Sequence, residues 1–166
     1  RTNPVFGAGD VNARILFVGE GPGEQEDLSG DPFVGRAGKL LDKMLDAVGL
    51  SRNKNVFITN IVKCRPPGNR DPQPDEVSAC IGYLRRQIEL INPEYIVCLG
   101  RVAAHCLIDP DFRVTKQHGQ FIEKDGILYM GTFHPAALLR NPAQKVDALD
   151  DLCKLRDRLQ DNNTTL

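Results

Sequence analysis

The side chains best suited to chemistry gather in short segments that each follow an apolar run. Residues 19–27 (GEGPGEQED) combine glycines with carboxylates, residues 60–70 (NIVKCRPPGNR) combine an amide with basic side chains, and residues 133–141 (FHPAALLRN) include a histidine. Glycines allow the backbone to lie close to a ligand. Carboxylates beside such a backbone suit a partner that is uncharged or transiently cationic.

The glycine-rich segment does not match the dinucleotide-binding pattern. A G-x-G-x-x-G motif that starts at Gly19 requires glycine where Glu24 stands, and one that starts at Gly21 requires glycine where Glu26 stands. The carboxylates would also repel a pyrophosphate. A solvated acidic turn that caps the next helix has the same composition, so the residues of this segment alone leave a ligand-binding and a structural interpretation open.

Basic side chains are concentrated at Lys63, Arg65 and Arg70, with prolines and a glycine between them. A stiff basic loop suits contacts to backbone phosphates, although a solvated charged loop has the same composition. A positive edge beside an acidic pocket favours a polyanion with chemistry at one unit. His134 directly follows an apolar run, and this position favours a catalytic role over a structural one.

The elements that must position these side chains follow from the hydrophobic pattern. Apolar runs without clean alternation predict strands that are covered on both faces. These runs are 14–20, 55–62, 95–100 and 127–133. The carboxyl ends of parallel strands meet at one edge of a sheet, where open α/β sheets bind their ligands. All the unusual segments follow strands, so we expect them to share that edge.

Helical periodicity fills the gaps between the strands. Helices are predicted over 36–49 and 75–91, after Gly100, and from about 142 to 159. Alternation of strands and helices predicts βαβ units. The predicted fold class is therefore α/β, a three-layer α/β/α sandwich with a central, mostly parallel four-stranded sheet. We expect one domain over 1–160 and a frayed tail over 161–166.

Composition narrows the function class and the compartment. The 166 residues carry 21 basic and 22 acidic side chains, a net charge of −1, so a strongly basic nucleic-acid-binding domain is excluded and a local basic patch is not. No apolar run approaches the roughly 20 residues of a membrane span, and the first residues do not resemble a signal peptide. Five cysteines without a C-x-x-C pair argue against a disulfide framework. We expect a cytoplasmic protein without a membrane segment.

Five segments in order resemble the uracil-DNA glycosylase superfamily, most closely its family 4, the iron–sulfur type. The segments are GEGPGEQED (19–27), PFVGRAGKLL (32–41), ITNIVKCRPPGNRDPQP (58–74), QIELINPEYIVCLG (87–100) and FHPAALLRNP (133–142). The resemblance implies a three-layer α/β fold and hydrolysis of the N-glycosidic bond between uracil and deoxyribose, which leaves an abasic site. The target base must first leave the base stack. The implied partner is uracil-containing DNA, single- or double-stranded, bound by a monomer.

The resemblance also implies which residues act at the glycosidic bond. Glu20 and Gly21 are expected near that bond, where a carboxylate favours the positive charge of an oxocarbenium-like sugar. His134 is expected to donate a hydrogen bond to uracil O2, where negative charge grows as the base leaves. Glu20 or an ordered water held by the backbone is expected to position the attacking water.

Three further residues are expected to bind the base. By resemblance, Glu26 lies beside the C5 edge of the pyrimidine, Phe33 stacks on uracil, and Asn60 reads its polar edge. Thr59 adjoins Asn60 at the end of the strand, so the sequence leaves the base-reading position open by one residue.

The expected DNA-binding residues lie in two loops. Lys63, Arg65 and Arg70 are predicted to contact phosphates, and Arg140, with Leu138 and Leu139, resembles a loop that wedges into the duplex.

Cys64 and Cys80 match two of the four cysteine ligands of the family's 4Fe-4S cluster. The family's other pair is a C-x-x-C that lies upstream of the segment resembling residues 1–3 and is not among these residues. Two thiolates make half of a four-ligand site. The expected role of the cluster is to hold the basic loop.

Two other functions remain possible at this point. One is a related enzyme that captures uracil covalently through a histidine inserted in the loop after the second strand, but residues 63–74 contain no histidine. The other is a non-catalytic DNA-binding or replication-associated module of the same fold.

Overall fold

The protein is described by a computed structural model, which covers residues 3–69 and 72–164. Its sheet has six strands in the order β1-β3-β2-β4-β6-β5. The strands are β1 (Ala8–Gly9), β2 (Ile15–Gly19), β3 (Val56–Asn60), β4 (Tyr95–Leu99), β5 (Ile122–Lys124) and β6 (Ile127–Thr132). The four predicted strands are confirmed as the central parallel strands. The prediction of four strands was incomplete, because β1 and β5 add short antiparallel edges.

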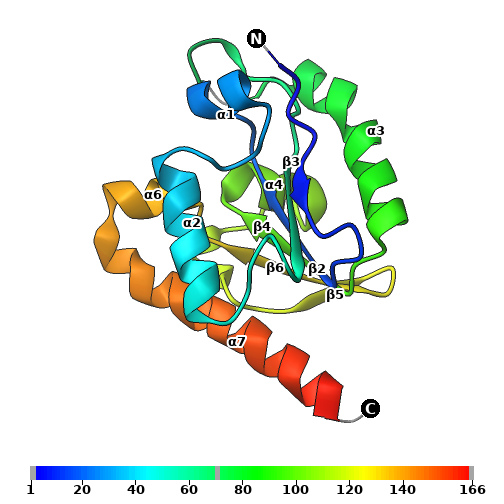
Figure 1. The fold of residues 1–166 in the computed structure, drawn as a ribbon, viewed down its shortest axis with the longest axis vertical. Coiled ribbons are helices and arrows are strands. Elements are labelled where there is room, and N and C mark those ends of the chain that lie inside the picture. Colours follow the sequence, from blue (N-terminus) through cyan, green and yellow to red (C-terminus); the bar gives the residue numbers. More distant parts are fainter. Residues whose placement is uncertain (1–2, 70–71, 165–166) are drawn as a thin grey trace.

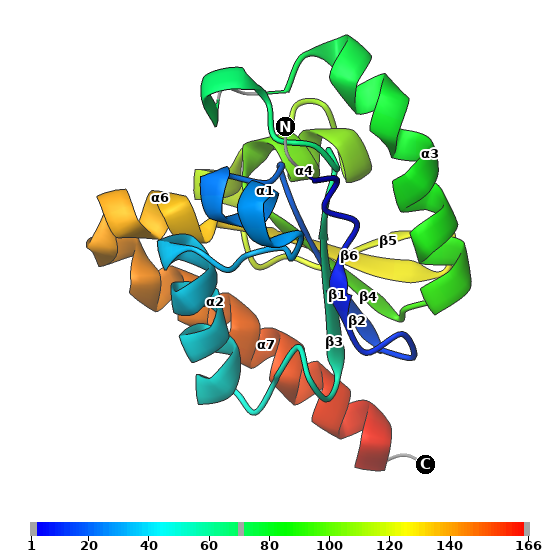
Figure 2. The same cartoon turned by 45° about the horizontal axis from the view of Figure 1, so that its top comes forward.

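Helices cover both faces of the sheet (Figure 1). They are α1 (Glu24–Ser29), α2 (Arg36–Ala47), α3 (Pro74–Ile91), α4 (Arg101–Leu107), α5 (Val114–Gln117), α6 (Pro135–Arg140) and α7 (Lys145–Thr164), with 3-10 turns at Pro67–Asn69 and Pro142–Gln144. Figure 2 shows α2, α6 and α7 on one face and α3 on the other. The three-layer sandwich is therefore confirmed.

The alternation of side chains along β2 shows how the two cores form. Ile15 and Phe17 pack into the core beneath α2 and α7, whereas Leu16 and Val18 pack into the core beneath α3 and α4. Successive strand residues point to opposite faces, so a strand covered on both faces is apolar at every position. All five residues of β2 are buried.

Helices α1 and α5 were not predicted, and two further helical segments differ from the prediction. Residues 135–140 were expected to form a loop, but His134 caps α6 and Pro135 occupies its first turn, where a missing N–H costs nothing. Helix α7 continues to Thr164, so residues 161–164 are helical where we expected fraying, and residues 165–166 lie outside the described part. No helix in the described residues is long and apolar enough to cross a membrane.

Candidate active site

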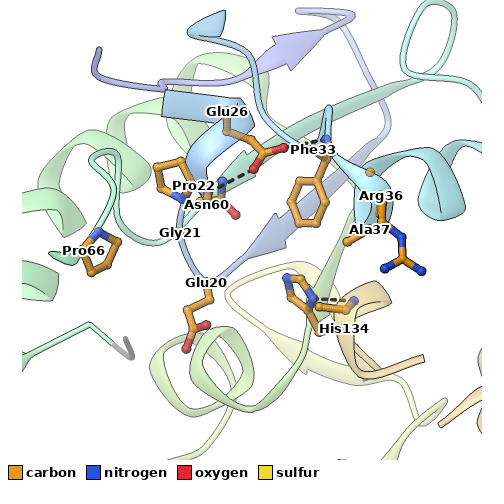
Figure 3. Close-up of a pocket in the computed structure, with 14 residues that line it drawn as sticks. Glu20, Gly21, Pro22, Glu26, Phe33, Arg36, Ala37, Asn60, Pro66 and His134 are labelled. Atoms are coloured by element: carbon orange, nitrogen blue, oxygen red, sulfur yellow. Dashed lines mark hydrogen bonds between the residues drawn. The ribbon is translucent and has the colours of Figure 1, made fainter. Parts of the chain in front are cut away.

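A pocket of about 250 Å³ lies at the carboxyl edge of the sheet, where β2, β3 and β6 end. A cavity of about 150 Å³ accepts benzene in another protein, so this pocket has room for one pyrimidine ring. Figure 3 shows Phe33, Asn60 and His134 around one space. These three residues come from separate parts of the chain. The lining comprises Glu20, Gly21, Pro22, Gly23, Glu26, Phe33, Gly35, Arg36, Ala37, Gly38, Asn60, Pro66, His134 and Ala136.

Asn60, the last residue of β3, contributes an unpaired polar atom. Its side-chain oxygen is the one buried side-chain oxygen or nitrogen in the described part of the chain that has no hydrogen-bond partner. A buried acceptor without a partner is costly, so a ligand that supplies a donor would repay its burial. Thr59 instead donates to the carbonyl of Phe6 at 2.6 Å, away from the pocket. Of these two residues, Asn60 is therefore the one that lines the pocket.

Gly19 shows how closely the pocket side chains approach the end of β2. A Cβ at Gly19 would lie 2.5 Å from Asn60 Oδ1 and 2.5 Å from Phe33 Cζ. Real Cβ atoms essentially never approach other atoms so closely. The missing side chain at Gly19 therefore lets the amide and the aromatic ring share the floor of the pocket.

Phe33 and His134 bring two rings together. Their centroids are 5.4 Å apart and the ring planes are tilted by 32°. Phe33 is buried, with 6% of its surface exposed, and lies just before α2. Both rings line the pocket, so a flat ligand there would contact a phenyl ring and an imidazole ring.

The hydrogen bonds of His134 determine which ring nitrogen carries its proton. His134 Nδ1 accepts a hydrogen bond from the backbone N–H of Ala136 at 3.0 Å. The neutral ring must then carry its proton on Nε2. Burial first, and then the positive charge of Arg140, lower the pKa of His134 from 6.5 to about 4, against the opposing charge of Glu26. At neutral pH this imidazole is therefore an uncharged donor.

Glu26 holds the wall of the pocket through its carboxylate. One oxygen accepts from the N–H of Gly23 at 3.0 Å, and the other accepts from the N–H groups of Val34 and Gly35, both at 2.8 Å. The side chain thus joins the start of α1 to the start of α2. Glu26 lines the pocket, together with Glu20 and Gly21.

Lys63 is not placed as the sequence predicted. Only 2% of its surface is exposed, and its ammonium donates to Thr59 Oγ1 at 2.6 Å, the Asn60 carbonyl at 2.7 Å and Gln87 Oε1 at 2.6 Å. Burial lowers the pKa of Lys63 to about 7, opposed by the charge of Cys80. A side chain held inside the protein does not reach a phosphate, so the predicted DNA contact of Lys63 is corrected.

Leu138 also differs from its predicted role as part of a wedge. It is fully buried and belongs to the core beneath α2 and α7. The helical geometry of α6 turns Leu138 inward, leaving Leu139 half-buried and Arg140 exposed. The outward side chains of α6 are therefore Leu139 and Arg140.

The remaining cations have different positions around the pocket. Arg65 is half-buried and precedes Pro66, which lines the pocket, whereas Arg70 lies outside the described residues. Arg36 is an exposed pocket residue that the sequence analysis missed. Arg36 is the first residue of a predicted helix, and the residues around it predict only helix formation.

Cys64 and Cys80 are both half-buried thiols near the basic loop. The backbone N–H of Lys63 donates to Cys80 Sγ at 3.4 Å, a contact that suits a thiolate ligand. Within residues 3–69 and 72–164, however, no group of three or more metal-ligating side chains comes together. The described residues therefore supply at most half of a four-thiolate site and do not hold a cluster by themselves.

Comparisons with known sequences identify a family and relatives that are similar to this chain. The sequence profile of the Uracil DNA glycosylase superfamily matches residues 6–156. The type-4 uracil-DNA glycosylase of Archaeoglobus fulgidus is 45% identical over 174 residues, covering 100% of this chain and 87% of the relative. The type-4 uracil-DNA glycosylase of Thermotoga maritima is 48% identical over 160 residues, covering 94% and 83%. The chain belongs to the uracil-DNA glycosylase superfamily.

Proposed function

We propose that this protein is a type-4 uracil-DNA glycosylase, which hydrolyses the N-glycosidic bond of uracil in DNA and leaves an abasic site. The observation that carries the proposal is the unpaired, buried oxygen of Asn60 in a pocket that also holds an uncharged histidine donor. The type-4 names of the similar proteins from Archaeoglobus fulgidus and Thermotoga maritima support the same activity.

The amide of Asn60 suits the polar edge of uracil. Uracil presents an N3–H donor and an O4 acceptor, and an asparagine offers one acceptor and two donors. Cytosine presents an unprotonated N3 and an amino donor, so it would leave the Asn60 oxygen and N–H mismatched. Each mismatch costs about 1–3 kcal/mol when the groups are buried. Selection of uracil thus follows from a single side chain.

His134 suits the leaving base rather than the intact substrate. As the glycosidic bond breaks, the departing uracil gains negative charge at O2. The Nε2–H of a neutral imidazole can stabilise that charge without a proton transfer, and donors of this type contribute about 3–4 kcal/mol. Because the interaction strengthens in the transition state, it raises the rate more than the affinity.

Glu20 serves the opposite charge. It lines the pocket beside Gly21, so its carboxylate would favour the positive charge of the sugar as the base leaves. The attacking water must approach the sugar from the side opposite the base. We propose that this water is positioned either by the Glu20 carboxylate or by backbone groups near Gly21.

Duplex DNA reaches this pocket only after the base has left the stack. Arg140 and Leu139 on α6 face outward beside His134, and we assign them to the DNA backbone and to the space that the base vacates. Arg65 and Arg70 are assigned to phosphates.

The protein would act as a monomer, with residues 1–160 as one glycosylase domain. An odd number of cysteines without a C-x-x-C pair favours a reducing cytoplasm over a secreted disulfide framework.

Cys64 and Cys80 are proposed as two ligands of a 4Fe-4S cluster. A bound cluster would supply structural support to the loop that contains Arg65, and the proposed hydrolysis needs no electron transfer. Iron analysis and visible absorbance of a chain that carries two further cysteines upstream test this assignment. A chain of that kind that is purified without oxygen and contains no iron would refute it.

A labelled oligonucleotide with one uracil tests the activity itself. The protein is incubated with the oligonucleotide, and hot alkali then cleaves the strand wherever an abasic site has formed. Cleavage at the uracil, with release of free uracil, is the expected result. A covalent protein–DNA adduct would instead indicate the capturing type of enzyme, and binding without cleavage would indicate a non-catalytic module.

A further inference from the structure

Arg52 binds the backbone that carries the aromatic floor of the pocket. It lies in the connection between α2 and β3, and its guanidinium donates to the carbonyls of Pro32 at 2.7 Å and Phe33 at 2.8 Å. The third contact, from Nε to Asp42 Oδ1 at 3.0 Å, fixes the guanidinium against α2. The Arg52 side chain is only 15% exposed, and its hydrogen bonds to the two carbonyls are partly buried.

The conformation of Phe33 gives these contacts a purpose. Phe33 has a φ angle of 52°, in the left-handed region that residues with a Cβ seldom occupy. Such a conformation persists only where its surroundings determine it. A planar guanidinium with two donors in a fixed fork is suited to hold two successive carbonyls.

Glu26 and Gly38 also contact the backbone around Phe33. Glu26 accepts from the N–H groups of Val34 and Gly35, which directly follow Phe33. Gly38 allows α2 to approach, because a Cβ at this position would overlap the Phe33 carbonyl. The carbonyl side is therefore fixed by Arg52 and the N–H side by Glu26, with the ring directed at Asn60 and His134 (Figure 3).

We infer that Arg52 is a positioning residue for base recognition, because it fixes Phe33 in the strained conformation that presents its ring to the flipped base. The inference rests on the proposed glycosylase function. Arg52 acts through Phe33 and not on the substrate, since it does not line the pocket in the described structure. Displacement of a reacting group by about 1 Å costs about a hundredfold in rate, so a loosened platform has a measurable effect.

A double-mutant cycle on Arg52 and Phe33 tests the inference. Arg52→Ala is expected to slow single-turnover uracil excision about tenfold to a hundredfold, with DNA affinity retained. In a Phe33→Ala background, Arg52→Ala should change the rate by no more than about twofold, because the group through which it acts is gone. Millimolar guanidinium should restore excision by Arg52→Ala but not by Phe33→Ala. Equal losses in both backgrounds would overturn the inference.

Two further measurements keep the result interpretable. Arg156→Ala is the matched control, because that arginine binds Asp157 on α7, and it should retain the wild-type rate. Hydrogen exchange of peptides over residues 31–38 does not depend on activity. It should become faster in Arg52→Ala and remain unchanged in Arg156→Ala. If the wild type excises no uracil, the proposed function fails, but hydrogen exchange still decides whether Arg52 fixes Phe33. Unchanged exchange in Arg52→Ala would refute the positioning role.

Discussion

His134 illustrates how one backbone hydrogen bond can set the chemistry of a side chain. The N–H of Ala136 occupies Nδ1, so Nε2 must donate, and burial keeps the ring uncharged at neutral pH. In the proposed reaction, the donor is thus oriented before the base enters the pocket. This preorganisation is the physical reason for expecting a large catalytic effect from one histidine.

Replacement of His134 should therefore affect the chemical step. His134→Ala is expected to lower the single-turnover excision rate at least about a hundredfold while DNA affinity changes little. Because alanine also removes the cap of α6, it should cost about 1 kcal/mol of stability. His134→Asn restores a capping side chain and serves as the control for that loss. A rate within threefold of wild type in both variants would remove His134 from the catalytic role.

The titration of His134 gives a second test at the same residue. The pKa of His134 is about 4 in the folded protein, against the ordinary value of 6.5 that applies to the unfolded chain. The unfolded chain therefore binds the proton first as the pH falls. Stability from the neutral ring is complete above pH 6.5 and decreases between 6.5 and about 4. NMR should show that the His134 ring does not titrate between these values, and its signal should be absent in His134→Ala. A titration near 6.5 would contradict the neutral donor.

Elements around the pocket are joined by a buried network behind His134. Asp151 on α7 accepts from Thr132 Oγ1 at 2.6 Å, at the end of β6, and from His118 Nδ1 at 2.8 Å. His118 in turn packs against Phe133, with ring centroids 4.9 Å apart. The network therefore ties α7 to the strand end from which His134 follows.

Removal of this carboxylate should loosen α7. Asp151→Ala is expected to reduce the free energy of unfolding by about 2–3 kcal/mol, because it leaves the Thr132 hydroxyl and His118 without their acceptor. Urea denaturation measures the loss. Asp150→Ala, one residue earlier on the exposed side of α7, is the control and should change little. Equal stabilities of the two variants would show that the network does not hold the helix.

The sequence predicted whole elements better than the direction of individual side chains. The strands buried on both faces were recognisable because each is a mostly apolar run without alternation, with polar residues only at the carboxyl ends of β3 and β6. The strands β1 and β5 have too few residues to show any pattern. The position of Leu138 on helix α6 turns its side chain inward. This direction could not be predicted while the segment was expected to be a loop. The burial of Lys63 was missed because its partner Gln87 lies on α3 and meets it only once α3 has packed on the sheet.

At the scale of the whole molecule, attraction to DNA must be local. A net charge of −1 gives no general attraction, so cations in and near the pocket have to supply it, together with the basic loop that contains Arg65. Arg36 on α2 and Arg140 on α6 come from elements that only the fold brings together. The sequence identified Arg140 through its motif but gave no signal for Arg36.

Neutralising these cations should change the salt dependence of DNA binding. Arg36→Gln and Arg140→Gln should each reduce the slope of log affinity against log salt by about 0.9 on duplex DNA, or about 0.7 on a single strand. Arg86→Gln is the control, because this exposed arginine pairs with Glu89 on α3, away from the pocket. Unchanged slopes in both pocket variants would return these cations to a merely solvated role.

The central claim, that Asn60 reads uracil in a pocket built for its excision, has one direct test. Excision of uracil and of cytosine is measured under single-turnover conditions for the wild type and Asn60→Asp, on otherwise identical oligonucleotides. An ionised aspartate has no donor, so the variant should lose uracil excision and gain relative tolerance of cytosine. The wild type should release uracil and leave cytosine intact. A uracil-to-cytosine ratio that stays at the wild-type value in Asn60→Asp would contradict the account.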